Sequence, residues 1–260
     1  MAEVLVERLE AVELITLNRP DRMNALTIPM VAALTSRVTA ASADDHCRAI
    51  VITGAGRGFC SGSDTSAWDG GSLTPLQSKE RLWKGYHLLV RAIDATDKPV
   101  IAAINGAAVG AGMDIALGCD IRYMADSAYM SEAYVQVGLI PGNGGAYFLP
   151  RLVGVPRALE LLWTGRRVEA TEAVKLGLAN STYANGEVVA AALAFAQLIA
   201  KQPPLVIQYT KRAVKQSLTC DLITALDLLS SHVAVIRSTE DSNEALAARR
   251  ERRAPRFTGK

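Results

Sequence analysis

Short apolar segments dominate the first half of the chain. Two segments with alternating apolar and polar residues, 4–9 and 12–17, are typical of paired strands. Two β-branched runs, 49–53 and 100–104, are apolar throughout and each leads into a glycine-rich loop, a pattern typical of buried parallel strands. Between them, residues 75–95 carry apolar side chains at helical spacing. This order of strand, loop, helix, strand and loop predicts an α/β core.

The second half of the chain is mainly helical in pattern. A helix is also expected at 28–41, another begins near Asp114, and strands are expected at 120–124 and 128–130. The later helices are predicted at 146–152, 156–163, 171–176, 188–201, 205–217 and 222–236. We therefore expect a core over residues 1–200 and a helical region over residues 201–260.

The composition is that of a soluble globular protein. Of 260 residues, 50% are hydrophobic and 21% are charged, which excludes a disordered or fibrous chain. No apolar run approaches the roughly 18 residues that span a bilayer, and Glu3, Glu7 and Glu10 make the start unlike a targeting peptide. We expect a cytoplasmic protein with no membrane partner. The four cysteines and three histidines are dispersed, so neither disulfides nor a metal site is expected.

The net charge of +2 conceals a basic C-terminus. Residues 249–260 hold six Lys or Arg residues against Glu251, a local charge of +5, so the remaining chain carries −3. A basic end is more often solvated than a ligand site. Nothing in the sequence indicates a nucleic-acid partner.

Two glycine-rich loops carry the most informative chemistry. They are RGFCSGSD at 57–64 and NGAAVGAGMD at 105–114, and both offer unhindered backbone N–H groups. Glycines after strands often serve only tight turns, but two such loops brought together would make an oxyanion hole for a thioester carbonyl. The dinucleotide, P-loop, serine-elbow and zinc-protease motifs are absent from the sequence.

Ordered motifs along nearly the whole chain resemble the crotonase, or enoyl-CoA hydratase/isomerase, superfamily. The strings are LNRP at 17–20, MNAL at 23–26, ITG at 52–54, FCSGSD at 59–64, KPVIAAING at 98–106, CDIR at 119–122, GLIPG at 138–142, LLWTG at 161–165 and RAPRF at 253–257. Each is weak alone, but their order and spacing make the resemblance specific.

This resemblance implies a ClpP/crotonase-like spiral of ββα units with a C-terminal helical region used in trimerisation. The chain would form a homotrimer or a homohexamer and take an acyl-CoA substrate, with coenzyme A as part of that substrate and no separate cofactor. The thioester oxygen would be held by the N–H groups of Ser63 and Ala111. The further substrate contacts implied are Asp64, Gly110, Gly112, Trp68 and Arg252, the last toward the CoA phosphates.

The resemblance also directs attention to the acid and base groups. Hydratases of the family carry two glutamates, whereas this chain has Asp114 at the first position, as dienoyl-CoA isomerases do, and Tyr134 at the second. Glu132 and Asn143 are the other candidates for the second role. Hydration needs two cooperating groups, while one carboxylate suffices to move a double bond.

Two other readings stay open at this point. One is a carbon–carbon bond hydrolase or decarboxylase of the same fold. The other is a catalytically degenerate acyl-CoA binding protein.

Overall fold

Two β-sheets form the centre of the protein in a computed structural model that describes residues 2–67 and 73–260. The larger sheet has the order β1-β2-β3-β5-β7-β10, and the smaller has the order β4-β6-β8-β9. The strands are β1 (Val4–Leu9), β2 (Val12–Leu17), β3 (Ala49–Gly54), β4 (Gly58–Cys60), β5 (Val100–Ile104), β6 (Ala107–Val109), β7 (Ile121–Ala125), β8 (Tyr129–Ser131), β9 (Val168–Glu169) and β10 (Ser181–Tyr183).

The chain climbs through these sheets as a spiral. Strands β3, β5 and β7 lie parallel in the larger sheet, and each is followed at once by a strand of the smaller sheet, β4, β6 and β8 in turn. Helices then carry the chain to the next coil. Within the smaller sheet, Val109 of β6 lies opposite Ser131 of β8. The expected α/β spiral of ββα units is confirmed.

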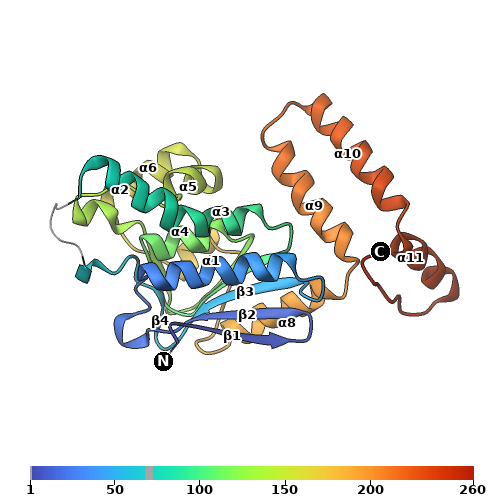
Figure 1. The fold of residues 1–260 in the computed structure, drawn as a ribbon, viewed down its shortest axis with the longest axis horizontal. Helices are drawn as coiled ribbons and strands as arrows, with labels where there is room; N and C mark the ends of the chain where they lie inside the picture. The colour runs from blue at the N-terminus through green and yellow to red at the C-terminus, as the bar shows by residue number, and fades with distance from the viewer. Residues whose placement is uncertain (1, 68–72) are drawn as a thin grey trace.

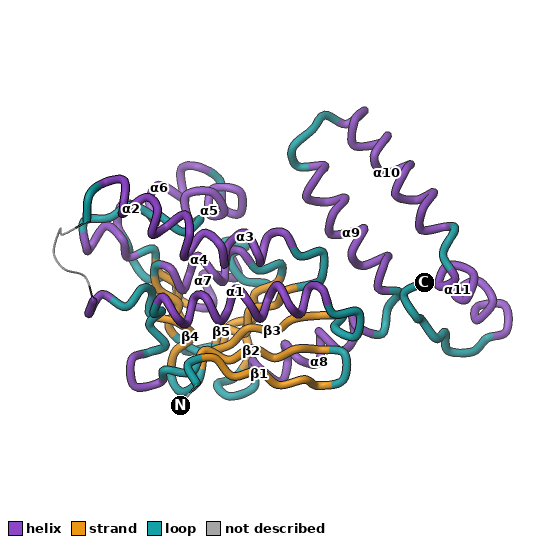
Figure 2. Tube along the Cα trace, in the orientation of Figure 1, coloured by secondary structure: helices purple, strands orange, loops and turns teal. Residues whose placement is uncertain are grey.

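Helices cover the sheets and complete the core. Helix α8 packs across strands β2, β3, β5, β7 and β10, while α1, α3 and α4 lie together beside the strands in Figure 2. The helices are α1 (Ile28–Ala43), α2 (Pro75–Arg81), α3 (His87–Ala95), α4 (Ala111–Gly118), α5 (Gly145–Val153), α6 (Val155–Thr164), α7 (Ala170–Lys175), α8 (Val188–Ala200), α9 (Pro204–Ser217), α10 (Leu222–Arg237) and α11 (Glu240–Glu251). Single 3-10 turns lie at Pro20–Arg22, Thr65–Ala67 and Ala133–Val137.

The helix predicted at residues 75–95 is interrupted. A wide π turn at Leu82–Tyr86 separates α2 from α3. Gly85 lies inside this turn and is a poor helix former. The carbonyl of Trp83 accepts a hydrogen bond at 2.9 Å from the Arg91 guanidinium. The segment is therefore helical throughout but changes its winding at the position of the glycine.

Three helices after Ala200 stand apart from the sheets in Figure 1. Two ion pairs attach α9 to the core: Lys211 contacts Asp120, in the turn before β7, at 2.6 Å, and Lys215 contacts Asp94, in the last turn of α3, at 2.8 Å. The boundary proposed near residue 200 stays a prediction. Within the described ranges, no single helix has the length and hydropathy to cross a membrane. Helices α8 and α9 meet that test only as a pair bent by 107°.

Candidate active site

The two glycine-rich loops meet at Gly62. A Cβ placed on Gly62 would lie 3.0 Å from the Val109 carbonyl oxygen and 3.7 Å from the Ala111 nitrogen. Gly62 has a φ of +101°, which favours glycine at this position. Ser63 directly follows Gly62, so the part of the first loop that carries Ser63 passes beside the part of the second loop that carries Ala111. The fold thus brings together the two loops on which the oxyanion hypothesis depends.

The backbone N–H groups of Ser63 and Ala111 have no acceptor among the residues that the structure describes. At Ser63 the neighbouring groups make the parallel bridge to Leu26: Leu26 donates to Gly62 at 2.8 Å, and Asp64 donates to Leu26 at 2.9 Å. Ala111 is the first residue of α4, and the first N–H groups of a helix have no partner within it. Both groups are therefore available to an external oxygen.

Asn105, the first residue of the second loop, hydrogen-bonds to the backbone at the start of the first loop. Its Oδ1 accepts a hydrogen bond from Gly54 N–H at 3.1 Å, and its Nδ2 donates to the carbonyls of Gly56 and Gly58 at 3.0 and 3.3 Å. Asn24, which is fully buried, donates to Gly58 at 2.8 Å from the other side. Side-chain amides therefore fix the backbone of one coil to that of the next.

Asp114 is the only charged residue of α4, and it is fully buried. Residues 111–117 are buried on every side of this helix. Taking a carboxylate out of water costs free energy unless its oxygens are paired. The first turn of a helix favours negative charge, which offsets part of this cost. Such a placement is typical of a functional carboxylate.

Tyr134 contacts one oxygen of that carboxylate. Its hydroxyl donates a short hydrogen bond to Asp114 Oδ2 and accepts one from Asn143 Nδ2 at 3.0 Å. The tyrosine ring also lies beside Gly110, where a Cβ would be 3.7 Å from ring carbons. The structure therefore joins the candidates Asp114, Tyr134 and Asn143 in one hydrogen-bonded chain. Asn143 holds the tyrosine in this chain and supplies no acid.

Glu132 lies on the other side of Asp114 and is 1% exposed. A Cβ on Gly145 would be 2.5 Å from Glu132 Oε1 and 2.6 Å from Asp114 Oδ1, so both oxygens border the same small space. Asp114 Oδ1 and both oxygens of Glu132 make no well-aligned hydrogen bond in the described part of the chain, although the backbone N–H groups of Gly145 and Asn143 are near enough to favour a charge on Asp114. All four candidates for acid and base roles are therefore gathered at one point.

Burial dominates the titration of this cluster. It raises the pKa of Asp114 to about 6, although the Tyr134 hydroxyl, Glu132 and nearby backbone N–H groups favour the carboxylate. Burial, and then the charge of Asp114, raise the pKa of Glu132 well above its ordinary value. The same two causes raise the pKa of Tyr134. Tyr134 is therefore protonated near neutral pH, and the raised pKa of each carboxyl shows that burial disfavours two charges in this cluster.

The other predicted substrate contacts fall into two groups. Gly110 and Gly112 are at the site: Gly110 has a φ of +50° and precedes α4, and a Cβ on Gly112 would overlap the Cys60 carbonyl oxygen. Asp64 is engaged by other residues of the protein: it accepts hydrogen bonds from Ser66 and forms an ion pair with Arg19 at 2.8 Å. These contacts lower the pKa of Asp64 to about 2. Trp68 lies outside the described residues.

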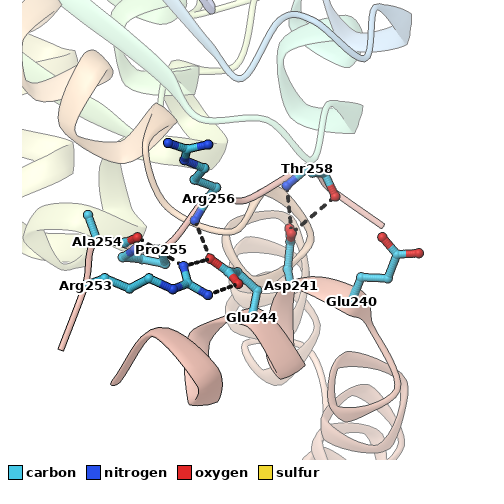
Figure 3. A pocket seen from close by; sticks show the side chains of 8 residues that line it. All are labelled: Glu240, Asp241, Glu244, Arg253, Ala254, Pro255, Arg256 and Thr258. Carbon is cyan, nitrogen blue, oxygen red and sulfur yellow. Dashed lines mark hydrogen bonds and ion pairs between the residues drawn. The ribbon is translucent and has the colours of Figure 1, made fainter. Parts of the chain in front are cut away.

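Arg252 is not brought to Asp114 within one chain. It ends α11 in a left-handed conformation, and Figure 1 places α11 far from α4. Figure 3 shows the neighbouring pocket, where Arg253 binds Glu244 and the Thr258 N–H donates to Asp241 at 2.7 Å. The tail thus folds back on α11.

Some features of the site carry no signal in the sequence. The Nε2 of His87 lies 2.7 Å from the Gly142 carbonyl oxygen, so this side chain joins α3 to the loop before α5. The closeness of Glu132 to Asp114 follows from the parallel pairing of β6 with β8. Among the described residues, no group of three His, Cys, Asp or Glu side chains could hold a metal ion.

Comparisons with known proteins agree with this geometry. The model of the family described as "Enoyl-CoA hydratase/isomerase" matches residues 7–260. The chain is 36% identical to 1,2-epoxyphenylacetyl-CoA isomerase of Escherichia coli over the whole of both chains, and 32% identical to short-chain-enoyl-CoA hydratase of Clostridium acetobutylicum over 96% of this chain and 95% of that protein. The crystal structure of an enoyl-CoA hydratase from Bacillus anthracis superposes with a TM-score of 0.93 at 31% identity and covers both chains fully. The chain therefore belongs to the enoyl-CoA hydratase/isomerase, or crotonase, family.

Proposed function

We propose that this protein acts on an acyl-CoA thioester and moves a carbon–carbon double bond, with Asp114 as the base. The observation that carries the proposal is the buried Asp114 carboxylate, whose pKa is raised to about 6. It lies in the first turn of the helix that begins with Ala111, one of the two residues whose backbone N–H groups have no acceptor in the described part of the chain. A base with a pKa just below neutral is ionised at working pH and still binds a proton readily.

The two N–H groups account for the activation of the substrate. When the thioester oxygen lies between Ser63 and Ala111, negative charge that develops on it meets fixed donors that need no reorganisation. This acidifies the carbon next to the carbonyl. Asp114 takes a proton from C2 of a 3-enoyl thioester, the electrons spread to C4 through the dienolate, and the same carboxyl returns the proton to C4. The product is the 2-enoyl thioester.

The environment of Tyr134 favours isomerisation over hydration. Hydration needs a second group that activates water or protonates the α-carbon while the first group acts. The Tyr134 hydroxyl already donates to Asp114, and its raised pKa makes it a poor base. Glu132 is fully enclosed and faces Asp114. A single exchanging carboxylate fits a proton shift, as in the relative named an isomerase.

The test compares two reactions of the purified protein. We expect conversion of 3-enoyl-CoA to 2-enoyl-CoA, and exchange of the C2 proton in D2O, to be faster than hydration of 2-enoyl-CoA. Asp114→Asn should reduce the rates of isomerisation and of C2-proton exchange by roughly a hundred- to ten-thousandfold. Asp126→Asn makes the same chemical change at an exposed position and should change neither. Hydration faster than isomerisation would refute the assignment, and the absence of isomerisation, hydration and exchange would refute the proposed function.

We also propose that the protein is a homotrimer or a homohexamer. Large apolar side chains are strongly exposed around the α9–α10 turn: Leu218 is 78% exposed, Leu222 71% and Ile223 75%. Contiguous exposed apolar surface of this kind indicates a protein interface. Sedimentation equilibrium should give three or six copies, and a monomer at micromolar concentration would contradict the proposal.

A further inference from the structure

The buried carboxyl of Glu132 has no role in the mechanism above. It is 1% exposed, and neither of its oxygens has a hydrogen-bond donor among the described residues. A buried polar group without a partner destabilises the folded state, and an ionised one does so more strongly. We therefore expect the Glu132 carboxyl either to be protonated or to have a role in the site.

Asp114 Oδ1 is the third oxygen that makes no well-aligned hydrogen bond, and it borders the same space at Gly145. Asp114 Oδ2 already accepts from Tyr134. One proton placed between the two carboxyl groups would turn two neighbouring acceptors into a donor and an acceptor. Two adjacent buried carboxyls cannot both ionise readily, so such a pair retains one proton.

We propose that Glu132 is a positioning residue that remains protonated at working pH and donates a hydrogen bond to Asp114 Oδ1. It does not touch the substrate. With Tyr134 on Oδ2, Glu132 holds the catalytic carboxylate from its other side and keeps it ionised in a fully buried place. This inference rests on the proposed function only for the activity used as one of its readouts.

The charged and titratable surroundings favour this assignment of the proton. The groups that face Glu132 are Asp114 from α4 and, beyond it, Tyr134 from the 3-10 turn after β8. The segment entering α5 contributes Asn143 and Gly145, which carry no charge and whose backbone N–H groups favour a charge on Asp114. No cation is present among these groups to stabilise an ionised Glu132. Asp114, in contrast, has the Tyr134 hydroxyl and the start of α4 to stabilise its charge.

The first experiment is the pH profile of C2-proton exchange for three forms of the full chain. Glu132→Gln keeps a neutral donor of the same size. The acidic limb, where the exchange rate falls as Asp114 becomes protonated, should therefore stay within about half a pH unit of its position in the parent. Glu132→Leu removes the donor, so the Asp114 carboxylate is less stabilised and the limb should move up by roughly one to two pH units. An unchanged limb in Glu132→Leu would overturn the proposal. So would a loss of exchange in Glu132→Gln as large as in Asp114→Asn, because Glu132 would then transfer the proton itself.

The second experiment does not depend on activity. Infrared difference spectra at pH 8 should show the carbonyl stretch of a protonated carboxylic acid, shifted in D2O, in the parent and not in Glu132→Gln. If the parent showed neither isomerisation nor exchange but kept this band, the proposed function would fail while the carboxyl pair stood. If the band were missing from a folded parent, the pair itself would be refuted.

Discussion

Replacing Asp114 with asparagine should stabilise the protein at neutral pH. Burial raises the pKa of this group from 3.8 to about 6, and one pKa unit corresponds to about 1.4 kcal/mol. A group whose pKa is higher in the folded state stabilises that state below pH 3.8, and the contribution is lost as the pH rises through about 6. Between acid and neutral pH the unfolding free energy of the parent therefore falls by about 3 kcal/mol because Asp114 ionises, whereas that of Asp114→Asn does not fall for this reason.

The assay is urea unfolding of both forms at equal protein concentration across pH 4 to 8. The fixed difference in packing between aspartate and asparagine does not vary with pH, so only the pH-dependent part of the difference in unfolding free energy counts. That part should grow toward about 3 kcal/mol in favour of Asp114→Asn as the pH rises.

Asp64→Asn is the matched control with the opposite sign. Hydrogen bonds from Ser66 and the Arg19 ion pair lower the pKa of Asp64 to about 2. Its stabilisation is therefore present at neutral pH and lost as the pH falls from 3.8 toward about 2. Across pH 4 to 8 the unfolding free energy of Asp64→Asn should therefore lie below that of the parent by an amount that does not change with pH. A difference between Asp114→Asn and the parent that stays constant from pH 4 to 8 would refute the reasoning about Asp114.

Three further predictions follow from the same geometry. Ala111→Pro removes one oxyanion donor at the first position of a helix, where proline is tolerated. We expect kcat to fall roughly a hundred- to thousandfold while the circular dichroism spectrum stays unchanged. Full activity would exclude the Ala111 N–H as a donor. Gly145→Ala places a Cβ 2.5 Å from Glu132 Oε1 and should lower both Tm and kcat, whereas Gly85→Ala, with nothing within 4 Å, should lower neither. The isomerase kcat/KM should rise with pH through about 6 as Asp114 ionises and then level off; a profile flat from pH 5 to 8 would exclude Asp114 as the base.

Much of the fold could be predicted from the hydrophobic pattern. The strand at Val100–Ile104 begins and ends where the β-branched run does, because a fully buried parallel strand needs such side chains. The strands Gly58–Cys60 and Ala107–Val109 were hidden in their loops, since three residues that include glycine or alanine give no periodic signal. Helix α11 was missed because its sequence, EDSNEALAARRE, has too few apolar residues to mark a face.

The candidate site was predicted only in its parts. The motif around Gly110 pointed to Ala111 and Asp114, which are close in sequence. The closeness of Glu132 to Asp114 depends on the register that sets Val109 beside Ser131, and this register connects strands too short to recognise. Spacing along the chain carries no information about such a contact, so the protonation of the pair could be inferred only in three dimensions.

Asn105 fixes the position of the two oxyanion loops relative to each other. Its bonds to Gly54, Gly56 and Gly58 link the second glycine-rich loop to the first. The helical segment 75–95 contacts this region through side chains, because the Tyr86 hydroxyl donates to the Leu26 carbonyl at 3.3 Å and His87 Nε2 lies 2.7 Å from the Gly142 carbonyl oxygen. Evolution within this scaffold can therefore vary the segment at its other positions while the hydrogen bonds between the two loops stay in place.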